Sequence, residues 1–347
     1  MRLVFLALVV AAVSCVVNNP QSSGAGGAPP SSGGAPSSGG ASSSGGKPSS
    51  GGVTSAGGAP SSGGKPSSGG TMSLGGTTSL GGAPSSGGSS QPPTSVNCPD
   101  VSQSFTNQVS GQYGGTQIPV DNNSSKTYFM QANWWGTPFN GQTESVSGIG
   151  FSMTNSSVPS SNPSLPLGFP SIFIGAYQAK KTTGSNLPKL VSALTSIPTI
   201  FSTNTNQMGY SSYNATYDVW FTQGNGLVSG GNPGSGGAYL MVWLFKPTDK
   251  SPRGTLKANG TTIDGVSGSW DVWYDPSPSD NMPCVSYVSN PDKLASIQFD
   301  LNYFIKDAVA KNYGVNNNQY LSIIFAGFEV WSGGSGLQVK QFCANVE

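Results

Sequence analysis

The sequence contains no histidine, and only 8% of its 347 residues are charged. The absence of histidine excludes the Ser-His-Asp and Cys-His nucleophile systems and the usual zinc sites. With 15 Lys and Arg against 14 Asp and Glu, the formal net charge is +1, so there is no basic surface for a nucleic acid. The glycine runs near Gly230 and Gly333 do not lie between a strand and a helix, and therefore indicate loops and not a phosphate site. We expect neither a cofactor nor a metal.

The apolar run near the N-terminus is too short to span a bilayer. Met1-Arg2 precedes an apolar stretch over residues 3–13, which Ser14-Cys15 follows. This pattern is typical of a secretory signal. Residues 12–15 resemble a bacterial lipoprotein signal, in which the cysteine becomes the lipidated first residue; the alternative is an ordinary cleaved signal with an incidental Cys15. Both interpretations predict export, either lipid-anchored through Cys15 at the bacterial surface or envelope, or secreted.

Three parts follow from composition: residues 1–17 are the signal and lipid attachment, 18–97 a linker, and 98–347 the folded domain. The linker is almost wholly Gly, Ser, Pro, Ala and Thr, with repeats of Gly-Gly-Ala-Pro-Ser-Ser-Gly-Gly. Such a tract buries too little apolar surface to offset its ordering entropy, so we expect a disordered tether. About 80 residues of flexible coil have a typical end-to-end distance of about 50 Å.

The domain consists mainly of short runs with strand character, separated by Gly, Pro and Asn. This pattern predicts an all-β sandwich or jelly roll. One stretch has helical spacing instead, which predicts an amphipathic helix over about 300–312 on the outside, with Asp300 as N-cap and Gly314 past its end. The predicted strands are 127–132, 147–154, 171–179, 199–203, 214–222, 239–246, 269–274, 295–299 and 321–328.

The strand at 239–245 places two different sets of side chains on its two faces. Tyr239, Met241 and Trp243 share one face, whereas Leu240, Val242 and Leu244 share the other, which is plain core. The row of phenol, thioether and indole suits stacking on a sugar as much as burial, and aromatic stripes in sandwiches are usually core. In the neighbouring strand Asp218 shares a face with Trp220, and Glu329 lies in an equally apolar segment. Because lone buried carboxylates are costly, these two suggest a glycan cleft.

The four cysteines divide into Cys15 and three others, Cys98, Cys284 and Cys343. Export favours a disulfide, but the sequence does not choose among the three pairings. Cys98 with Cys343 is the preferred pair because it would join the two ends of the domain. A structural role is expected, with one thiol free or paired elsewhere.

Seven motifs in order resemble glycoside hydrolase family 12, the endo-β-1,4-glucanases and xyloglucanases built as a β-jelly roll. The resemblance spans the domain after Cys98, and the predicted helix falls where the family has its single helix. The motifs are Asn133-Trp134-Trp135-Gly136, Phe169-Pro170-Ser171, residues 213–220, Leu240-Met241-Val242-Trp243, Pro252-Arg253-Gly254, Trp270-Asp271-Val272-Trp273, and Gly327-Phe328-Glu329-Val330-Trp331.

The resemblance implies a retaining mechanism, in which one Glu is the nucleophile and a second Glu, about 5 to 5.5 Å away, is acid and then base. It assigns the acid/base to Glu329, and desolvation should favour its protonated form. It places Asp218 beside the nucleophile. The implied sugar contacts are Asn133 and Trp135 on the non-reducing side, with Met241, Trp243 and Trp331 near the point of cleavage.

The chain departs from the family at the nucleophile, because Tyr239 stands where the family has Glu before the Leu-Met-Val-Trp run. There is no Asp or Glu between Asp218 and Asp249, and the other two glutamates are Glu144, expected on a solvated face, and the terminal Glu347. Near the acid/base, Phe325 stands where the family commonly has Gln, and Val330 where it has Pro.

Three functions are compatible with this pattern. In the first, the protein binds cellulose, xyloglucan or mixed-linkage glucan as a monomer with lost or reduced hydrolysis, because deleting one member of a catalytic set costs on the order of 10⁴ to 10⁶ in rate. In the second, it still hydrolyses β-1,4-glucan through Glu329 with Asp218 or Tyr239, since a Tyr nucleophile is known in sialidases. In the third, the cleft is vestigial and the loops bind another protein as a decoy.

Overall fold

The computed structural model describes most of the chain after residue 105. The described residues are 16–17, 96, 98, 105–120, 124–136, 141–156, 163–178, 180–204, 212–224, 228, 230–276 and 282–347. The predicted signal and linker lie almost wholly outside these ranges. Among the described residues, no helix has both the length and the apolar character needed to cross a membrane.

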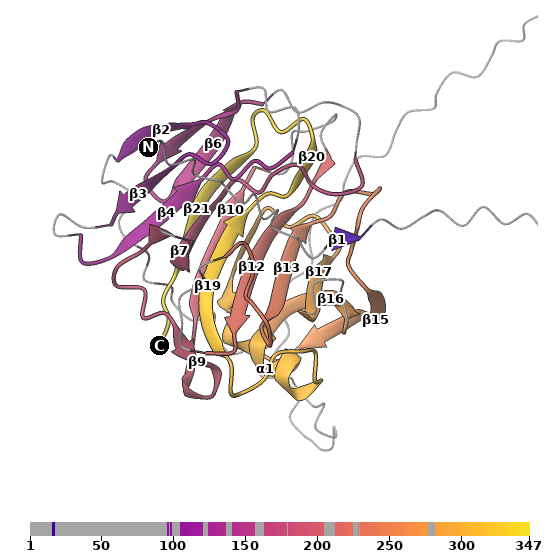
Figure 1. Cartoon of the computed structure of the whole chain (residues 1–347). Helices are drawn as coiled ribbons and strands as arrows, with labels where there is room; N and C mark the ends of the chain where they lie inside the picture. Colours follow the sequence, from indigo (N-terminus) through magenta and orange to yellow (C-terminus); the bar gives the residue numbers. More distant parts are fainter. Residues whose placement is uncertain are drawn as a thin grey trace, which may run out of the picture. The chain divides into compact units, whose positions relative to one another are not determined.

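Two mainly antiparallel sheets form the two layers of the domain, as predicted for an all-β sandwich (Figure 1). In the larger sheet, the strands that run across the middle are rich in Tyr, Phe, Trp, Val and Ile, the residues that favour a pleated and buried surface. Its order is β15 (Thr255–Ile263), β16 (Val266–Asp275), β17 (Cys284–Asn290), β13 (Ala238–Phe245), β12 (Ala215–Thr222), β19 (Tyr320–Gly327), β7 (Ser171–Tyr177), β4 (Thr127–Gln131) and β3 (Gly115–Pro119), with β8 (Lys180–Lys181) on β7 and β9 (Lys189–Leu190) on β19. Its β13 and β17 pair in parallel.

The smaller sheet covers one face of the larger sheet. Its order is β18 (Ser296–Asp300), β10 (Pro198–Thr203), β21 (Gln338–Ala344), β6 (Gly150–Asn155), β5 (Thr143–Ser147) and β2 (Thr106–Ser110). Short antiparallel pairs join β11 (Ser212–Tyr213) to β20 (Val330–Ser332) and β1 (Val16–Val17) to β14 (Ser251–Pro252), and a 3-10 turn covers Val191–Ala193.

The main core lies between the two sheets, and a second apolar cluster lies apart from it. Phe201 of the smaller sheet packs edge-on to Tyr217 of the larger sheet, with ring centroids 5.2 Å apart. Leu240, Val242 and Leu244 of β13 belong to this main core. Their neighbours in β13 belong to the second cluster, as the alternation of the pleat predicts.

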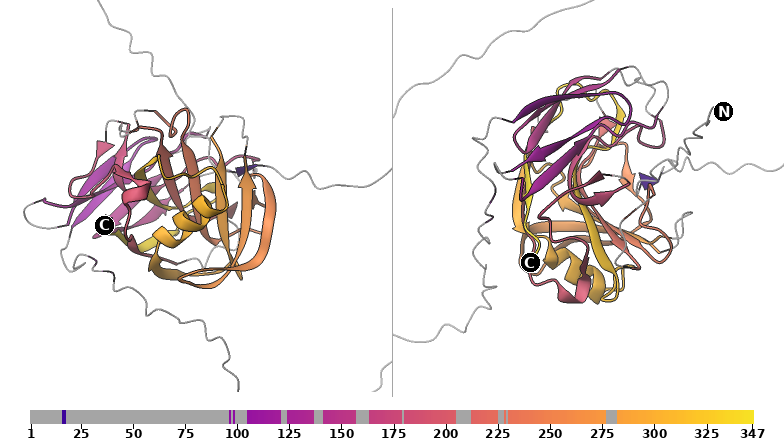
Figure 2. Two further views of the ribbon diagram at one scale, coloured as in Figure 1. Left: turned by 90° about the horizontal axis from the view of Figure 1, so that it is seen from below. Right: turned by 60° about the vertical axis from the view of Figure 1, so that its left-hand side comes forward.

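The predicted helix is α1 (Asn302–Ala310), which begins two residues later than expected. Asp300 accepts hydrogen bonds from the backbone N–H groups of Asn302, at 2.9 Å, and Ile197, at 2.7 Å. The N-cap position itself is Leu301, which makes no side-chain capping hydrogen bond, so the prediction of Asp300 as N-cap is wrong by one residue. The helix lies against one end of the sandwich (Figure 2), where Phe304 contacts the rings of Trp270 and Tyr287.

The disulfide between Cys98 and Cys343 is present, with its Cα atoms 5.8 Å apart across 245 positions of sequence. The preferred pairing is therefore confirmed. Cys284 is also disulfide-bonded, and its partner is not among the described residues. None of the three described cysteines has a free thiol.

Candidate functional site

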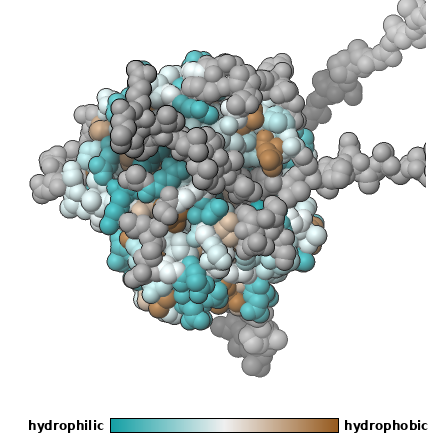
Figure 3. All heavy atoms as spheres, in the orientation of Figure 1, coloured by the Kyte–Doolittle hydropathy of each residue, from teal (hydrophilic) through white to brown (hydrophobic). Residues whose placement is uncertain are grey.

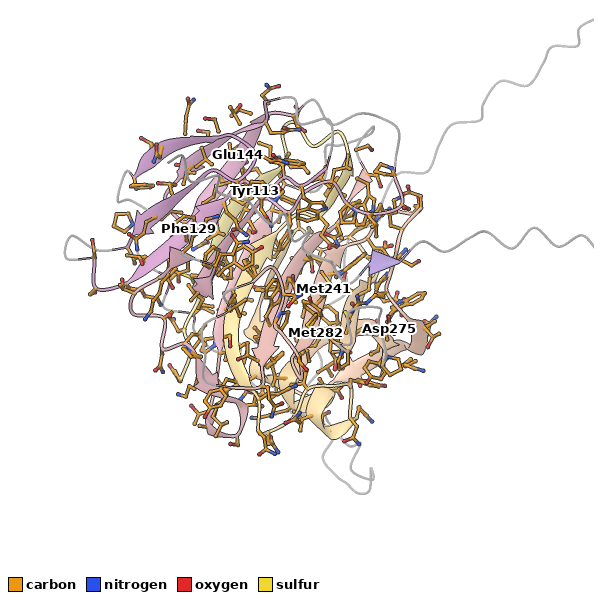
Figure 4. All side chains as sticks on the ribbon, viewed as in Figure 1. Tyr113, Phe129, Glu144, Met241, Asp275 and Met282 are labelled. Atoms are coloured by element: carbon orange, nitrogen blue, oxygen red, sulfur yellow. A yellow bond between two sulfur atoms is a disulfide. The ribbon has the colours of Figure 1, made fainter. Side chains whose placement is uncertain are left out.

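The second apolar cluster lies on the face of the larger sheet that does not contact the main core, and we call it the aromatic cluster. Trp135 and Trp273 pack against it from the side. Figure 4 labels two of its methionines, Met241 and Met282. Its members are Phe169, Phe173, Tyr177, Trp220, Val228, Tyr239, Met241, Trp243, Met282, Cys284, Val288, Ile323, Phe325 and Trp331. The cluster thus unites four side chains that the sequence assigns to the cleft: Tyr239, Met241, Trp243 and Trp331.

Tyr239 occupies the first half of β13 and is 1% exposed. It is paired in register with Trp220 of β12, and the two rings meet edge-on with centroids 5.6 Å apart. The guanidinium carbon of Arg253 lies 5.8 Å from the centre of the phenol ring. The phenol ring therefore has both an indole and a cation as neighbours.

Arg253 is a charged residue of this site to which the sequence assigned no role. It is 3% exposed, and its Nε lies 3.3 Å from a carboxylate oxygen of Asp275. Its Nη2 donates a hydrogen bond to the carbonyl of Met282 at 3.1 Å. These partners neutralise and orient the guanidinium, as a buried cation requires. Its position in the Pro252-Arg253-Gly254 motif was the one signal in the sequence.

Asp218 lies in the middle of β12, opposite Met241 of β13 and Phe325 of β19. It is 6% exposed, and one of its carboxyl oxygens has no hydrogen-bond partner among the described residues. Burial raises the pKa of this carboxyl to about 7, although the nearby Trp220 indole and the Arg253 cation oppose the rise. Near neutral pH the group is therefore poised to take up or release a proton.

Glu329 follows β19 directly after Phe328 and is 1% exposed. The side-chain amide of Asn214 donates a hydrogen bond to its Oε2. The Asn214 side chain also accepts a hydrogen bond at Oδ1 from Glu329 N at 2.9 Å, and the two backbones are joined because Asn214 N donates to the Glu329 carbonyl at 3.0 Å. Asn214 thus fixes the orientation of the carboxyl group, a role that sequence reasoning missed.

Asn133 and Trp135, which the sequence predicts to contact the sugar on the non-reducing side, lie just after the end of β4. Asn133 has a left-handed backbone with φ of 49°; of the two residues that follow it, Trp134 belongs to the main core and Trp135 packs against the aromatic cluster. Trp135 is half-buried, packs against the aromatic cluster, and donates from Nε1 to the Pro166 carbonyl at 2.7 Å.

Comparisons with known proteins assign the family. The model of glycosyl hydrolase family 12 matches residues 126–347. The chain belongs to this family. The "Probable cellulase Cel12b" of Mycobacterium tuberculosis is 30% identical over 163 residues, which are 47% of this chain and 99% of that protein.

Solved structures of family 12 proteins share the fold. The endoglucanase cel12A from Rhodothermus marinus has a TM-score of 0.59 and 26% identity, covering 70% of this chain and 99% of that one. A metagenome-derived family 12 endoglucanase has a TM-score of 0.60 and 24% identity, covering 71% and 99%. The chain is thus a family 12 jelly roll, and every residue that we assigned to the cleft lies inside the matched range.

One expectation about this family 12 domain is corrected. Glu144 is not on a solvated face: it is fully buried between the sheets, where Trp134 donates to it. In addition, the aromatic side chains assigned to the cleft are almost fully buried, with Trp243 and Trp331 at 0% exposure. A lysine side chain lies over one of them: the Nζ of Lys250 is 5.7 Å from the centre of a Trp331 ring.

The surface on the side of the molecule seen in Figure 1 is mostly hydrophilic or neutral in its described part, with a few isolated hydrophobic residues (Figure 3). Large hydrophobic side chains that are exposed include Tyr113, Leu165 and Leu256. Of the aromatic side chains assigned to the cleft, Trp135 is the one that remains partly exposed.

Proposed function

We propose that this family 12 protein recognises β-1,4-glucan and that its hydrolysis is lost or reduced, because Tyr239 occupies the position of the nucleophilic Glu. One observation carries the proposal. Across the central strands β12, β13 and β19, Asp218 is the single carboxylate, and the residue before Leu240-Met241-Val242-Trp243 is a buried phenol. Glu329, as acid/base, has no second glutamate to act with.

The surroundings of Tyr239 do not convert it into a good nucleophile. Attack requires the phenolate, and an unperturbed Tyr has a pKa of about 10, far above that of a carboxyl group. The nearby Arg253 cation would favour a phenolate, but its charge is largely balanced by Asp275 at 3.3 Å. Loss of one member of a catalytic set costs on the order of 10⁴ to 10⁶ in rate. Binding needs no such group, because stacking and hydrogen bonding suffice.

Cellulose, xyloglucan and mixed-linkage glucan are the candidate ligands. The names of the relatives support this class, since the Rhodothermus marinus protein is called an endoglucanase and the Mycobacterium tuberculosis protein a probable cellulase. Asn133 and Trp135 would contact the sugar on one side of the site, with Met241, Trp243 and Trp331 at its centre. A monomer is sufficient for this function.

A second candidate function is residual endo-β-1,4-glucanase activity, and the state of Asp218 favours it. With its pKa raised to about 7, this buried carboxyl is suited to exchange a proton at neutral pH. It could act as base, or assist Tyr239 as nucleophile, while Glu329 protonates the leaving oxygen. The Asn214 amide already holds the Glu329 carboxyl in a fixed orientation.

One experiment separates the two functions. The purified protein is incubated with carboxymethylcellulose, xyloglucan and mixed-linkage glucan, and reducing ends are measured together with retardation in glucan-containing gels. Retardation without reducing ends supports the binder, and both together support the enzyme. Trp135→Ala is the control, since it should reduce retardation. If the wild-type protein shows neither effect, glucan recognition is wrong.

Export and a lipid anchor on Cys15 form a separate part of the proposal, which rests on the sequence. A lipid and a disulfide exclude each other at one sulfur atom. Mass spectrometry of the mature protein tests this: a lipid adduct on Cys15 supports the anchor, and a peptide cross-linked to Cys284 contradicts it.

A further inference from the structure

A buried carboxylate of the smaller sheet is bonded to the segment that carries the expected sugar contacts. Glu144 of β5 is 0% exposed, and its Oε1 accepts a hydrogen bond from Trp134 Nε1 at 2.9 Å. Trp134 is 1% exposed and lies between Asn133 and Trp135. This bond therefore ties the end of β4, in the larger sheet, to the smaller sheet. Figure 4 labels Glu144.

The carboxyl group of Glu144 has few other contacts to justify its burial. Its Oε2 has no hydrogen-bond partner among the described residues. Burial raises its pKa to about 7, and the bond from Trp134 only partly offsets this. A group this costly to bury contributes little to the core, so the bond to Trp134 is its main interaction in the described structure.

Trp134 transmits this restraint to a stack of three chain segments. Its ring is packed so closely on Gly168 that a Cβ there would lie 2.2 Å from the ring. Two backbone hydrogen bonds join the segment around Gly168 to the segment of Trp134. The Leu167 carbonyl accepts one from Trp135 N at 3.0 Å, and Phe169 N donates the other to the Asn133 carbonyl at 2.9 Å.

The same middle segment is joined to the strand of the acid/base. Val330 N donates to the Gly168 carbonyl at 3.0 Å, and Leu167 N donates to the Val330 carbonyl at 2.7 Å. Val330 is the residue directly after Glu329. Of the three hydrogen-bonded segments, the one with Asn133 and Trp135 is thus farthest from Val330. Glu144 of the opposite sheet restrains this segment through its hydrogen bond with Trp134.

We propose that Glu144 is a positioning residue, which through Trp134 fixes Asn133 and Trp135 in the arrangement that grips the sugar. It touches no ligand itself. The prediction that removing the Glu144 carboxyl weakens glucan binding rests on the proposed function. The prediction that Glu144 restrains the segment with Asn133 and Trp135 does not.

The test compares three variants with a matched control. Glu144→Leu removes the acceptor, Glu144→Gln retains a carbonyl acceptor without the charge, and Trp134→Phe keeps a ring but removes the donor. The control is Tyr128→Phe, which also removes a buried hydrogen-bonding hydroxyl between the sheets, where Ala344 N donates to Tyr128 Oη at 3.3 Å. Tyr128 lies at the other end of β4 from Asn133.

The first measurement is amide hydrogen exchange without any ligand, at a temperature where all variants are folded. We expect exchange in peptides covering 133–136 and 167–169 to accelerate about tenfold in Glu144→Leu and Trp134→Phe, and to stay near wild type in Glu144→Gln and Tyr128→Phe. Combining Glu144→Leu with Trp134→Phe should add little to either single change. Equal acceleration in Tyr128→Phe, or none in Glu144→Leu, would overturn the proposal.

The second measurement is affinity for mixed-linkage glucan. We expect about tenfold weaker binding by Glu144→Leu, with Glu144→Gln restored to within about twofold of the wild type. If Glu144→Leu binds the glucan as tightly as the wild type does, the positioning role is wrong. Failure of the wild type to bind would instead contradict the proposed function, and hydrogen exchange would still decide the role of Glu144.

Discussion

The guanidinium of Arg253 lies over the ring of Tyr239, 5.8 Å from its centre, at the position where the family resemblance places the nucleophile. Arg253 is also close to the carboxyl groups of the site: burial raises the pKa of Asp218, which the Arg253 charge opposes, and Arg253 pairs with Asp275 at 3.3 Å. The site therefore has a buried cation beside the ring of Tyr239. This relationship makes the consequence of restoring a carboxylate predictable.

Tyr239→Glu should create or strongly raise endoglucanase activity. The new carboxyl group would lie close to Arg253, whose charge favours the ionised form that a nucleophile needs. Since loss of the nucleophile costs on the order of 10⁴ to 10⁶ in rate, the gain should be several orders of magnitude. Release of reducing ends from carboxymethylcellulose and mixed-linkage glucan measures it.

Tyr239→Gln is the control for this change, because Gln has the shape of Glu without its charge. It should bind glucan and remain as inactive as the wild type. A Tyr239→Glu protein that folds, as judged by circular dichroism and thermal unfolding, and yet releases no reducing ends would show that position 239 is not the nucleophile position.

Glu329→Gln should abolish any hydrolysis by the wild type or by Tyr239→Glu, while glucan binding is retained. The amide has no acidic proton to give to the leaving oxygen, so catalysis should fall by about 10² to 10⁴. Asn214 can still hydrogen-bond to the side-chain carbonyl. Reducing-end release and gel retardation are measured on the same preparation, and unchanged activity on barley glucan would exclude Glu329 as the acid/base.

The sequence predicted the parts of this fold in which hydrophobic alternation is strong. β13 is correct to within one residue at each end because it consists of aromatic and branched side chains, and its two faces separate into two clusters as the pleat requires. In contrast, β15, with the sequence TLKANGTTI, was missed because most of its side chains are exposed and polar, and β17 because Ser alternates with apolar residues. Pairing with neighbours, and not local preference, makes these two segments strands.

The sequence assigned residues to the site through family motifs, Asp218, Tyr239, Met241 and Trp331 among them. It did not predict their contacts: the bond between Asn214 and Glu329 joins positions 115 residues apart. The bond between Trp134 and Glu144 joins segments that belong to the two different sheets. No local pattern distinguishes such a carboxylate from a solvated one, which explains the wrong prediction for Glu144.

The stability of the domain should fall as the pH rises from about 5 to about 8. Burial raises the pKa of both Asp218 and Glu144 to about 7, from ordinary values of 3.8 and 4.5. Between those values and pH 7 the folded state binds more protons than the unfolded state, so raising the pH favours unfolding. Differential scanning calorimetry across this range measures the effect. Asp218→Asn and Glu144→Gln should each reduce the slope, and a midpoint that rises towards pH 8 in the wild type would contradict the burial of these groups.

Breaking the bond between Cys98 and Cys343 should destabilise the domain without altering the site. The bond closes a loop of 245 positions, and loop-closure entropy makes cross-links over such long loops stabilising by about 2–5 kcal/mol. We therefore expect Cys98→Ser combined with Cys343→Ser to lower the free energy of unfolding by this amount in urea titrations. Glucan affinity at a temperature well below the unfolding midpoint should not change, because Cys343 lies on β21 in the smaller sheet, away from the aromatic cluster. If the free energy of unfolding did not change, strand pairing alone would hold the two ends of the domain as firmly as the disulfide does.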